Sequence, residues 1–108
     1  MYEEKAVAYL IENDFKIIKR NYRCKIGEID IIAMKDNILR FIEVKYRKND
    51  AFGVPTQAVN SKKQKKIYMT AQWFLAENKI GENVCCSFDV MSIQGSEIEY
   101  IFNSYGVM

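Results

Sequence analysis

The feature that most constrains this chain is the presence of charged residues inside segments that otherwise read as buried strands. Glu43 lies between Ile42 and Val44, and Lys45 follows two positions after Glu43. Because side chains alternate between the two faces of a strand, Glu43 and Lys45 share one face. Asp30 lies in a similar apolar run of the preceding segment. Burying charge without a partner is costly, so these residues predict a functional site shared by two strands.

Composition excludes several classes of protein and of active site. With 108 residues, the chain predicts a single domain spanning 1–108 with room for one core. Its longest apolar runs are strand-sized and broken by charge, so we expect no membrane span, no secretory signal and a cytoplasmic location. Histidine is absent, which excludes Ser-His and Cys-His nucleophilic sites. Cys24, Cys85 and Cys86 lack zinc or disulfide spacing and are expected to be reduced thiols in the core.

The apolar pattern predicts an α/β domain. The expected elements are a helix at 2–13, strands at 15–22, 28–34 and 38–46, a loop at 48–55, a helical turn at 56–60, a helix from Ser61 to just before Asn78, and strands at 84–93 and 98–102. The first three strands should form an antiparallel meander, and a right-handed crossover through the main helix should place the fourth strand parallel to the third. Burial on both faces predicts a central third strand. The predicted fold is therefore a mixed sheet of about five strands flanked by helices, in the order α-β-β-β-α-β-β.

Two carboxylates that meet on adjacent strands are suited to a hard cation. If Asp30 and Glu43 converge, they repel each other unless a cation or a proton lies between them. Mg²⁺ or Mn²⁺ takes oxygen ligands and is commonly held by one or two carboxylates together with substrate phosphate. Lys45 would then orient a water molecule or stabilise negative charge in the transition state. The pattern predicts metal-dependent phosphodiester hydrolysis.

Several segments together resemble a known family. They are Asn21-Tyr22-Arg23, Gly27-Glu28-Ile29-Asp30, Phe41-Ile42-Glu43-Val44-Lys45-Tyr46-Arg47, the helix around Lys63, and Phe88-Asp89-Val90. Over nearly the whole chain they resemble the uncharacterised YraN-like family of the PD-(D/E)XK nuclease superfamily, which is similar to archaeal Holliday junction resolvases. The resemblance departs at Glu3, where the family commonly has Gly, and at Ser87, where it commonly has Arg.

The resemblance implies a restriction-endonuclease-like core and an endonuclease that hydrolyses DNA with Mg²⁺ or Mn²⁺, with branched DNA such as Holliday junctions among its substrates. It implies that Asp30 and Glu43 are the metal ligands and that Lys45 is the catalytic lysine. Glu4, in the first helix, would be a further acidic residue of the site.

Each of these site residues also has a purely structural interpretation. Glu43 and Lys45 would form a same-face ion pair worth ~0–1 kcal/mol on any exposed strand, and the apolar surroundings of Asp30 favour the site instead. Glu28 shares a strand face with Asp30 and is either a solvated acid or a supporting acid of the site. Glu4 is also explained by the helix dipole, which favours acids in a first turn.

The net charge is only +2, but basic residues gather around the acidic strands. The candidates for nucleic-acid contact are Arg23, Arg47, Lys62, Lys63, Lys65 and Lys66. Such a lysine run is ordinarily a solvated helix face, and beside a phosphate-cleaving site it would bind the backbone of DNA, with RNA left open. A symmetric junction suits a two-fold homodimer. The alternatives are a catalytically silent nucleic-acid-binding module and a plain interaction domain.

Three further features of the second half leave structural and functional interpretations open. Gln64 and Tyr68 have the spacing of the Gln-x-x-x-Tyr motif of RecB-like nucleases, but Ser61 with Gln64 fits a helix capping box, which we favour. Asp89 either lines the site or caps a sheet edge. The helix aromatics expected in the core, and not on a base-stacking surface, are Tyr68, Trp73 and Phe74.

Overall fold

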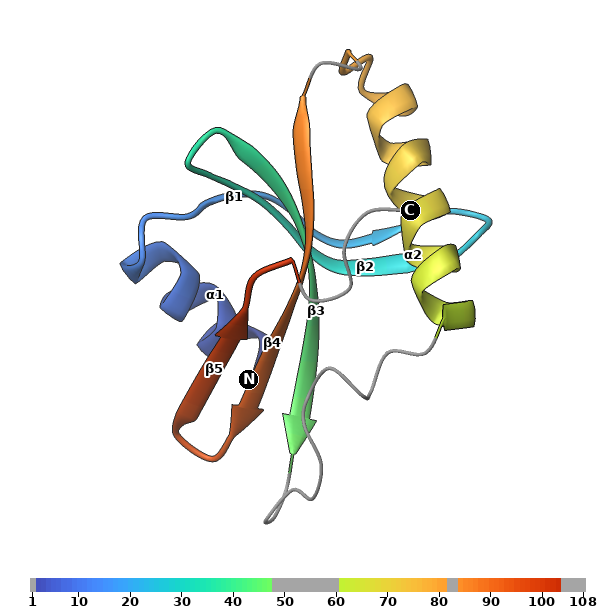
Figure 1. Cartoon of the computed structure of the whole chain (residues 1–108). Helices are drawn as coiled ribbons and strands as arrows, with labels where there is room; N and C mark the ends of the chain where they lie inside the picture. Colours follow the sequence, from blue (N-terminus) through green and yellow to red (C-terminus); the bar gives the residue numbers. More distant parts are fainter. Residues whose placement is uncertain (1, 48–60, 82–83, 104–108) are drawn as a thin grey trace.

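A five-stranded mixed sheet with one helix against each face makes up the computed structural model, which describes residues 2–47, 61–81 and 84–103 (Figure 1). The elements are α1 (Tyr2–Glu12), β1 (Lys16–Arg23), β2 (Glu28–Lys35), β3 (Ile38–Arg47), α2 (Ser61–Glu77), β4 (Cys85–Gln94) and β5 (Glu97–Ile101). Their order matches the predicted order, and their ends differ from the expected ends by at most one residue. The loop and helical turn expected at 48–60 lie outside the described residues.

The sheet confirms the predicted topology, with strand order β1-β2-β3-β4-β5 and β3 in the centre. Strands β1, β2 and β3 pair antiparallel, as the expected meander requires. Strand β4 pairs parallel to β3, from Ile38 opposite Cys85 to Arg47 opposite Gln94. Helix α2 provides the crossover between these two parallel strands, and β5 adds antiparallel to β4 at the edge.

The two faces of β3 pack against different helices because its side chains alternate in direction. Leu39 and Phe41 are buried in the cluster that also contains Ile67, Ala71 and Phe74 of α2. Ile42 belongs instead to the opposite cluster, which contains Ala6 and Leu10 of α1. Glu43 and Lys45 continue the row of Leu39 and Phe41, so the acid and the base of β3 lie on the α2 face. Neither described helix has the length and apolar character needed to cross a membrane.

Two core expectations are wrong. Trp73 is 43% exposed, because the sheet-facing side of α2 is occupied by Ile67, Ala71 and Phe74 and Trp73 points about 100° away from Phe74. Cys85 is exposed, since it is the first residue of β4, whereas Cys24 and Cys86 are half-buried. All three thiols are free, as expected.

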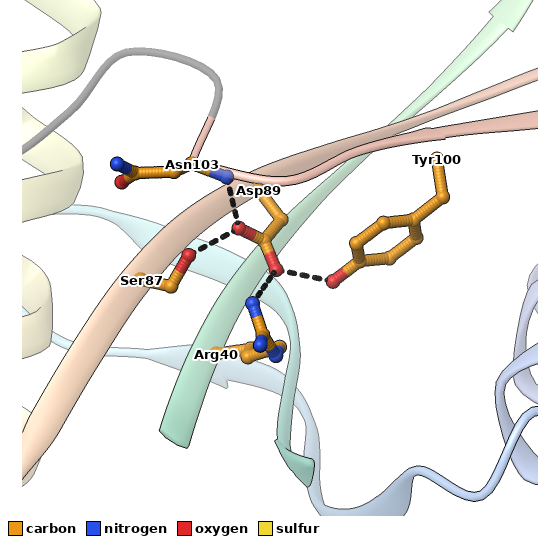
Figure 2. Close-up of polar contacts among 5 residues, drawn as sticks. All are labelled: Arg40, Ser87, Asp89, Tyr100 and Asn103. Atoms are coloured by element: carbon orange, nitrogen blue, oxygen red, sulfur yellow. Dashed lines mark hydrogen bonds and ion pairs between the residues drawn. The ribbon is translucent and has the colours of Figure 1, made fainter. Parts of the chain in front are cut away.

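Asp89 is fully buried at the centre of a polar network that joins β3, β4 and β5 (Figure 2). Arg40 Nη1 lies 3.3 Å from Asp89 Oδ2, and the Tyr100 hydroxyl donates to the same oxygen. Ser87 Oγ at 2.5 Å and the backbone N–H of Asn103 at 2.7 Å donate to Oδ1. Asp89 therefore anchors β5 and the residues that follow it to the central strands, in place of either role expected for it.

The partner of this carboxylate, Arg40, is itself only 5% exposed. Its guanidinium lies 4.9 Å from the ring centroid of Phe102, and its Nε–H donates no hydrogen bond to any described residue. Among the described residues, Asp89 is the only acidic residue that forms an ion pair with Arg40. Removal of one member of such a pair leaves the other charge uncompensated in the core.

We expect Asp89→Ala to lower the free energy of unfolding by about 3–5 kcal/mol, because it leaves Arg40 buried without its counter-charge. Urea denaturation followed by circular dichroism would measure the loss. Glu99→Ala, an exposed acid-to-alanine change on β5, is the control and should cost about 0.5 kcal/mol or less. A loss below about 1 kcal/mol for Asp89→Ala would contradict the assignment of Asp89 as the anchor.

Candidate metal and phosphate site

The site begins where the backbone pairing of β2 with β3 ends. The last register pair toward the start of β2 is Ile31 opposite Ile42. One residue nearer the start of β2, Asp30 Oδ2 accepts a hydrogen bond from the backbone N–H of Val44 at 2.8 Å. A side-chain carboxylate thereby takes a donor that a continuing ladder would give to a carbonyl. The bond holds Asp30 against β3 beside Glu43.

Glu43 holds two lysines that reach it from different parts of the chain. Lys63 Nζ, from the first turn of α2, lies 2.7 Å from Glu43 Oε2, and Lys45 Nζ lies 3.3 Å from the same oxygen. The Glu43 side chain is only 11% exposed. The structure therefore brings together Asp30, Glu43 and Lys45, as expected, and adds Lys63 from α2.

Burial raises the pKa of Asp30 from its ordinary value of 3.8 to about 6. The hydrogen bond from Val44 acts in the opposite direction, the negative charges of Glu43 and Glu28 raise the pKa further, and the charge of Lys63 lowers it. The surroundings of Asp30 therefore disfavour the ionised form of its carboxylate. Glu28 lies close enough to contribute to the electrostatic field at Asp30.

The pKa values of Lys45 and Lys63 are shifted in opposite directions. Burial, and then the neighbouring Lys63, lower the pKa of Lys45, against the attraction of Glu43. Burial also opposes the charge on Lys63, but its hydrogen bonds to Glu43 and Lys45 and the negative charges of Glu43 and Asp30 together outweigh burial and raise its pKa. Lys45 is the lysine that gives up a proton more readily, while Lys63 is the firmer positive charge.

The donor set fits a magnesium or manganese ion held by few protein ligands. Asp30 and Glu43 offer hard carboxylate oxygens, and a cation between them would relieve the repulsion that contributes to the raised pKa of Asp30. In the described part of the chain, no three His, Cys, Asp or Glu side chains form a group that could hold a metal. A metal here would therefore rely on waters and substrate phosphate for its remaining ligands, as Mg²⁺ often does.

The other residues expected at the site lie apart from this cluster or on its rim. Glu4 is 70% exposed, and its Oε2 lies 3.6 Å from Arg20 Nη2. Arg23 Nε forms a surface ion pair with Glu28 at 3.0 Å. The side chain of Arg47 lies outside the described residues. The remaining exposed members of the expected basic surface on α2 are Lys62, Lys65 and Lys66.

The direct contact of Lys63 with Glu43 was not foreseen. The signal lay in the spacing, because Lys63 precedes Ile67 and Thr70 by four and seven residues and so shares the buried side of α2. Arg40 was missed as well, although a basic residue between Leu39 and Phe41 in an apolar strand is an equally clear sign of a buried partner. The capping role of Ser61 with Gln64 stays a prediction.

A cavity of about 560 Å³ among the described residues lies elsewhere. It lies between α2 and the strands, with Phe41, Leu75, Val84 and Phe88 in its wall. None of the four charged residues of the cluster lines it.

The raised pKa of Asp30 predicts a specific pH dependence of stability. The Asp30 carboxyl binds its proton more tightly in the folded protein than in the unfolded chain. The contribution of Asp30 to the free energy of unfolding therefore falls as pH rises from about 4 to about 6. We expect Asp30→Asn to be more stable than wild type by about 1–3 kcal/mol at pH 8 and equal to it below about pH 4. Urea unfolding at several pH values measures the difference. Asp36→Asn, in an exposed turn, is the control for the substitution itself. A difference between Asp30→Asn and wild type that stays the same at every pH would contradict the shift.

Comparison with known proteins gives the family of the chain. Residues 2–93 match the uncharacterised protein family UPF0102. The chain is 43% identical over 103 residues to a UPF0102 protein of Lachnoclostridium phytofermentans, covering 95% of this chain and 87% of the relative. It is 44% identical over 102 residues to UPF0102 protein FN1370 of Fusobacterium nucleatum, covering 94% and 85% of the two chains. A Clostridioides difficile relative, UPF0102 protein CD630_12710, is 42% identical over 105 residues, covering 95% and 91%. The chain belongs to the uncharacterised protein family UPF0102.

Proposed function

We propose that this chain is a Mg²⁺- or Mn²⁺-dependent endonuclease of the PD-(D/E)XK type that hydrolyses phosphodiester bonds of DNA. The observation that carries the proposal is the meeting of Asp30, Glu43 and Lys45 at the end of the β2–β3 ladder. The order of helices and strands agrees with the core that the resemblance implies. Branched DNA, including Holliday junctions, is the substrate class that the resemblance suggests.

The residues divide the chemistry between them. Asp30 and Glu43 would hold the cation, which would neutralise a phosphate oxygen and acidify a bound water. Lys45, 3.3 Å from Glu43, would hold the attacking water or donate a hydrogen bond to the negative charge that develops on the phosphate. Glu4 enters through the resemblance and is secondary, since its carboxylate is paired with Arg20.

The surroundings of the cluster support a polyanionic substrate. Lys62, Lys65 and Lys66 are exposed near the start of α2, and no acidic residue lies in its first turn. The positive end of the helix dipole adds to their charge, which makes this end of α2 suited to a phosphate group. Arg23, at the end of β1, is a further basic candidate for nucleic-acid contact, although Glu28 partly neutralises it.

One observation favours a second candidate, a catalytically silent nucleic-acid-binding module. Glu43 Oε2 is already contacted by two lysines, so the charges near this oxygen are balanced without a metal. Such a module would bind nucleic acid equally well in EDTA and after Glu43→Gln.

We expect wild type to cleave at least one of a panel of labelled single-stranded, duplex, flap and four-way-junction DNAs in Mg²⁺ or Mn²⁺. Lys45→Ala should lower the rate by at least about 10²-fold, because it removes a group that acts on the transition state. Gel analysis of single-turnover reactions would measure the rates. Lys79→Asn, an exposed lysine after the far end of α2, is the control and should cleave at the wild-type rate.

Both variants must unfold cooperatively in urea, like wild type. Binding without cleavage, unchanged by EDTA and by Glu43→Gln, would instead support the silent module. Cleavage that persists in Lys45→Ala would remove Lys45 from the reaction.

We further expect a homodimer, because a domain of this size contacts a short stretch of duplex and a symmetric junction suits a two-fold pair of sites. Sedimentation velocity would be measured on the protein alone and with a four-way junction. A dimer in either sample is the expected result. Monomer in both samples would overturn the dimer and leave the proposed cleavage chemistry untouched.

A further inference from the structure

Lys63 is the closest cation to Glu43, although it belongs to neither strand of the site. Its Nζ lies 2.7 Å from Glu43 Oε2, compared with 3.3 Å for Lys45. We propose that the Lys63 ammonium takes the place of the divalent cation beside Glu43 and Asp30 in the metal-free protein, and that metal binding displaces it toward the phosphate of the substrate. The proposal rests on the proposed function, because it concerns the same pair of carboxylates.

The position of Lys63 on α2 supports this assignment. Lys63, Ile67, Thr70 and Phe74 follow one another at intervals of four, three and four residues and therefore share one side of the helix. The last three are buried against the sheet, so Lys63 continues the sheet-facing row by one turn. The adjacent Lys62 points to solvent. Lys63 is thus directed at the site by the helix itself.

The local electrostatics of the helix point the same way. A lysine in a first helical turn is unfavourable, because the positive end of the helix dipole repels it. The first turn of α2 offers no acidic side chain to balance that repulsion. The negative charge of Glu43 on β3, whose Oε2 lies 2.7 Å from Lys63 Nζ, offsets this repulsion, and the charge of Asp30 adds to the effect. A divalent cation bound to the same carboxylates would neutralise their attraction for the Lys63 ammonium and would also repel the ammonium directly.

The displacement requires movement of a side chain and not of the helix. Gly27, in the loop before β2, lies so close to α2 that a Cβ there would come within 3.1 Å of Thr70 Oγ1. This contact, together with the buried row, holds α2 against the start of β2. The four-carbon stem of a lysine has the freedom to swing its ammonium away, and the Lys63 side chain is 43% exposed.

The first test measures Mn²⁺ affinity by isothermal titration calorimetry on the full chain without DNA. We expect Lys63→Met to bind Mn²⁺ about fivefold to tenfold more tightly than wild type, because a competing charge is removed. Lys62→Met, the matched change one residue earlier, should stay within about twofold of wild type because its ammonium lies in solvent. Lys63→Arg keeps the charge and should show no gain. Urea unfolding verifies that each variant is folded.

The second test follows the displaced ammonium. Binding of four-way-junction DNA is measured by fluorescence anisotropy over a range of salt, with Ca²⁺ as the metal in one series and EDTA in the other. Lys63→Met should lower the salt slope by about one phosphate contact in Ca²⁺ and leave it unchanged in EDTA, where Glu43 holds Lys63. Lys62→Met should have the same effect in both series.

The outcomes separate the two proposals. Mn²⁺ binding by wild type that Lys63→Met fails to strengthen would overturn the displacement and leave the metal site standing. If Lys63→Met lowers the salt slope equally in Ca²⁺ and in EDTA, Lys63 contacts the phosphate whether or not metal is bound. That result also overturns the displacement. Absence of Mn²⁺ binding in wild type and in every variant would overturn the metal site, and with it both proposals.

Discussion

The hydrogen bond from Val44 N–H to the Asp30 carboxylate is the contact on which the candidate site depends. It ends the pairing of β2 with β3 by substituting a side chain for a backbone acceptor, and it draws a charged group into a partly buried position. Burial and the neighbouring Glu43 charge then disfavour ionisation, which is why the pKa of Asp30 lies near 6. The positive charges beside these acids, Lys45 and Lys63, follow as a requirement of that arrangement.

Two clusters of charge lie on opposite faces of the sheet, and they differ in the kind of partner that satisfies them. Asp89 is completely buried and is held by four side-chain or backbone donors, of which Arg40 and Ser87 are themselves buried. Glu43 is held by two long, partly exposed lysines. Partners of that kind can leave and be replaced by a cation or a phosphate. This contrast makes the Glu43 cluster the functional candidate and the Asp89 cluster part of the architecture.

The apolar pattern was sufficient to predict the order of helices and strands, but the meeting of Asp30 with Glu43 depends on the register of β2 against β3 and entered only as a hypothesis. Strand periodicity did predict that Glu43 and Lys45 share a face, because the alternation of side chains assigns faces without tertiary information. It could not place Lys63, whose contact depends on how α2 lies across the sheet. Trp73 was misplaced for a related reason, since an apolar residue at helical spacing does not reveal which side of the helix the sheet covers. At Ser87, where the resemblance departs, Arg40 is the opposite residue in the parallel pair and supplies a guanidinium to Asp89.

The charges of the site also explain why metal and phosphate belong together in the proposed function. Two carboxylates, Asp30 and Glu43, face two ammonium groups, Lys45 and Lys63, so a fully ionised cluster is neutral. A divalent cation alone would leave it with two excess positive charges at the positive end of α2, which is unfavourable at low dielectric. A phosphodiester brings negative charge to the same place and accepts the lysine that the cation repels. Cation and nucleic acid should therefore each favour the binding of the other, since such coupling is reciprocal.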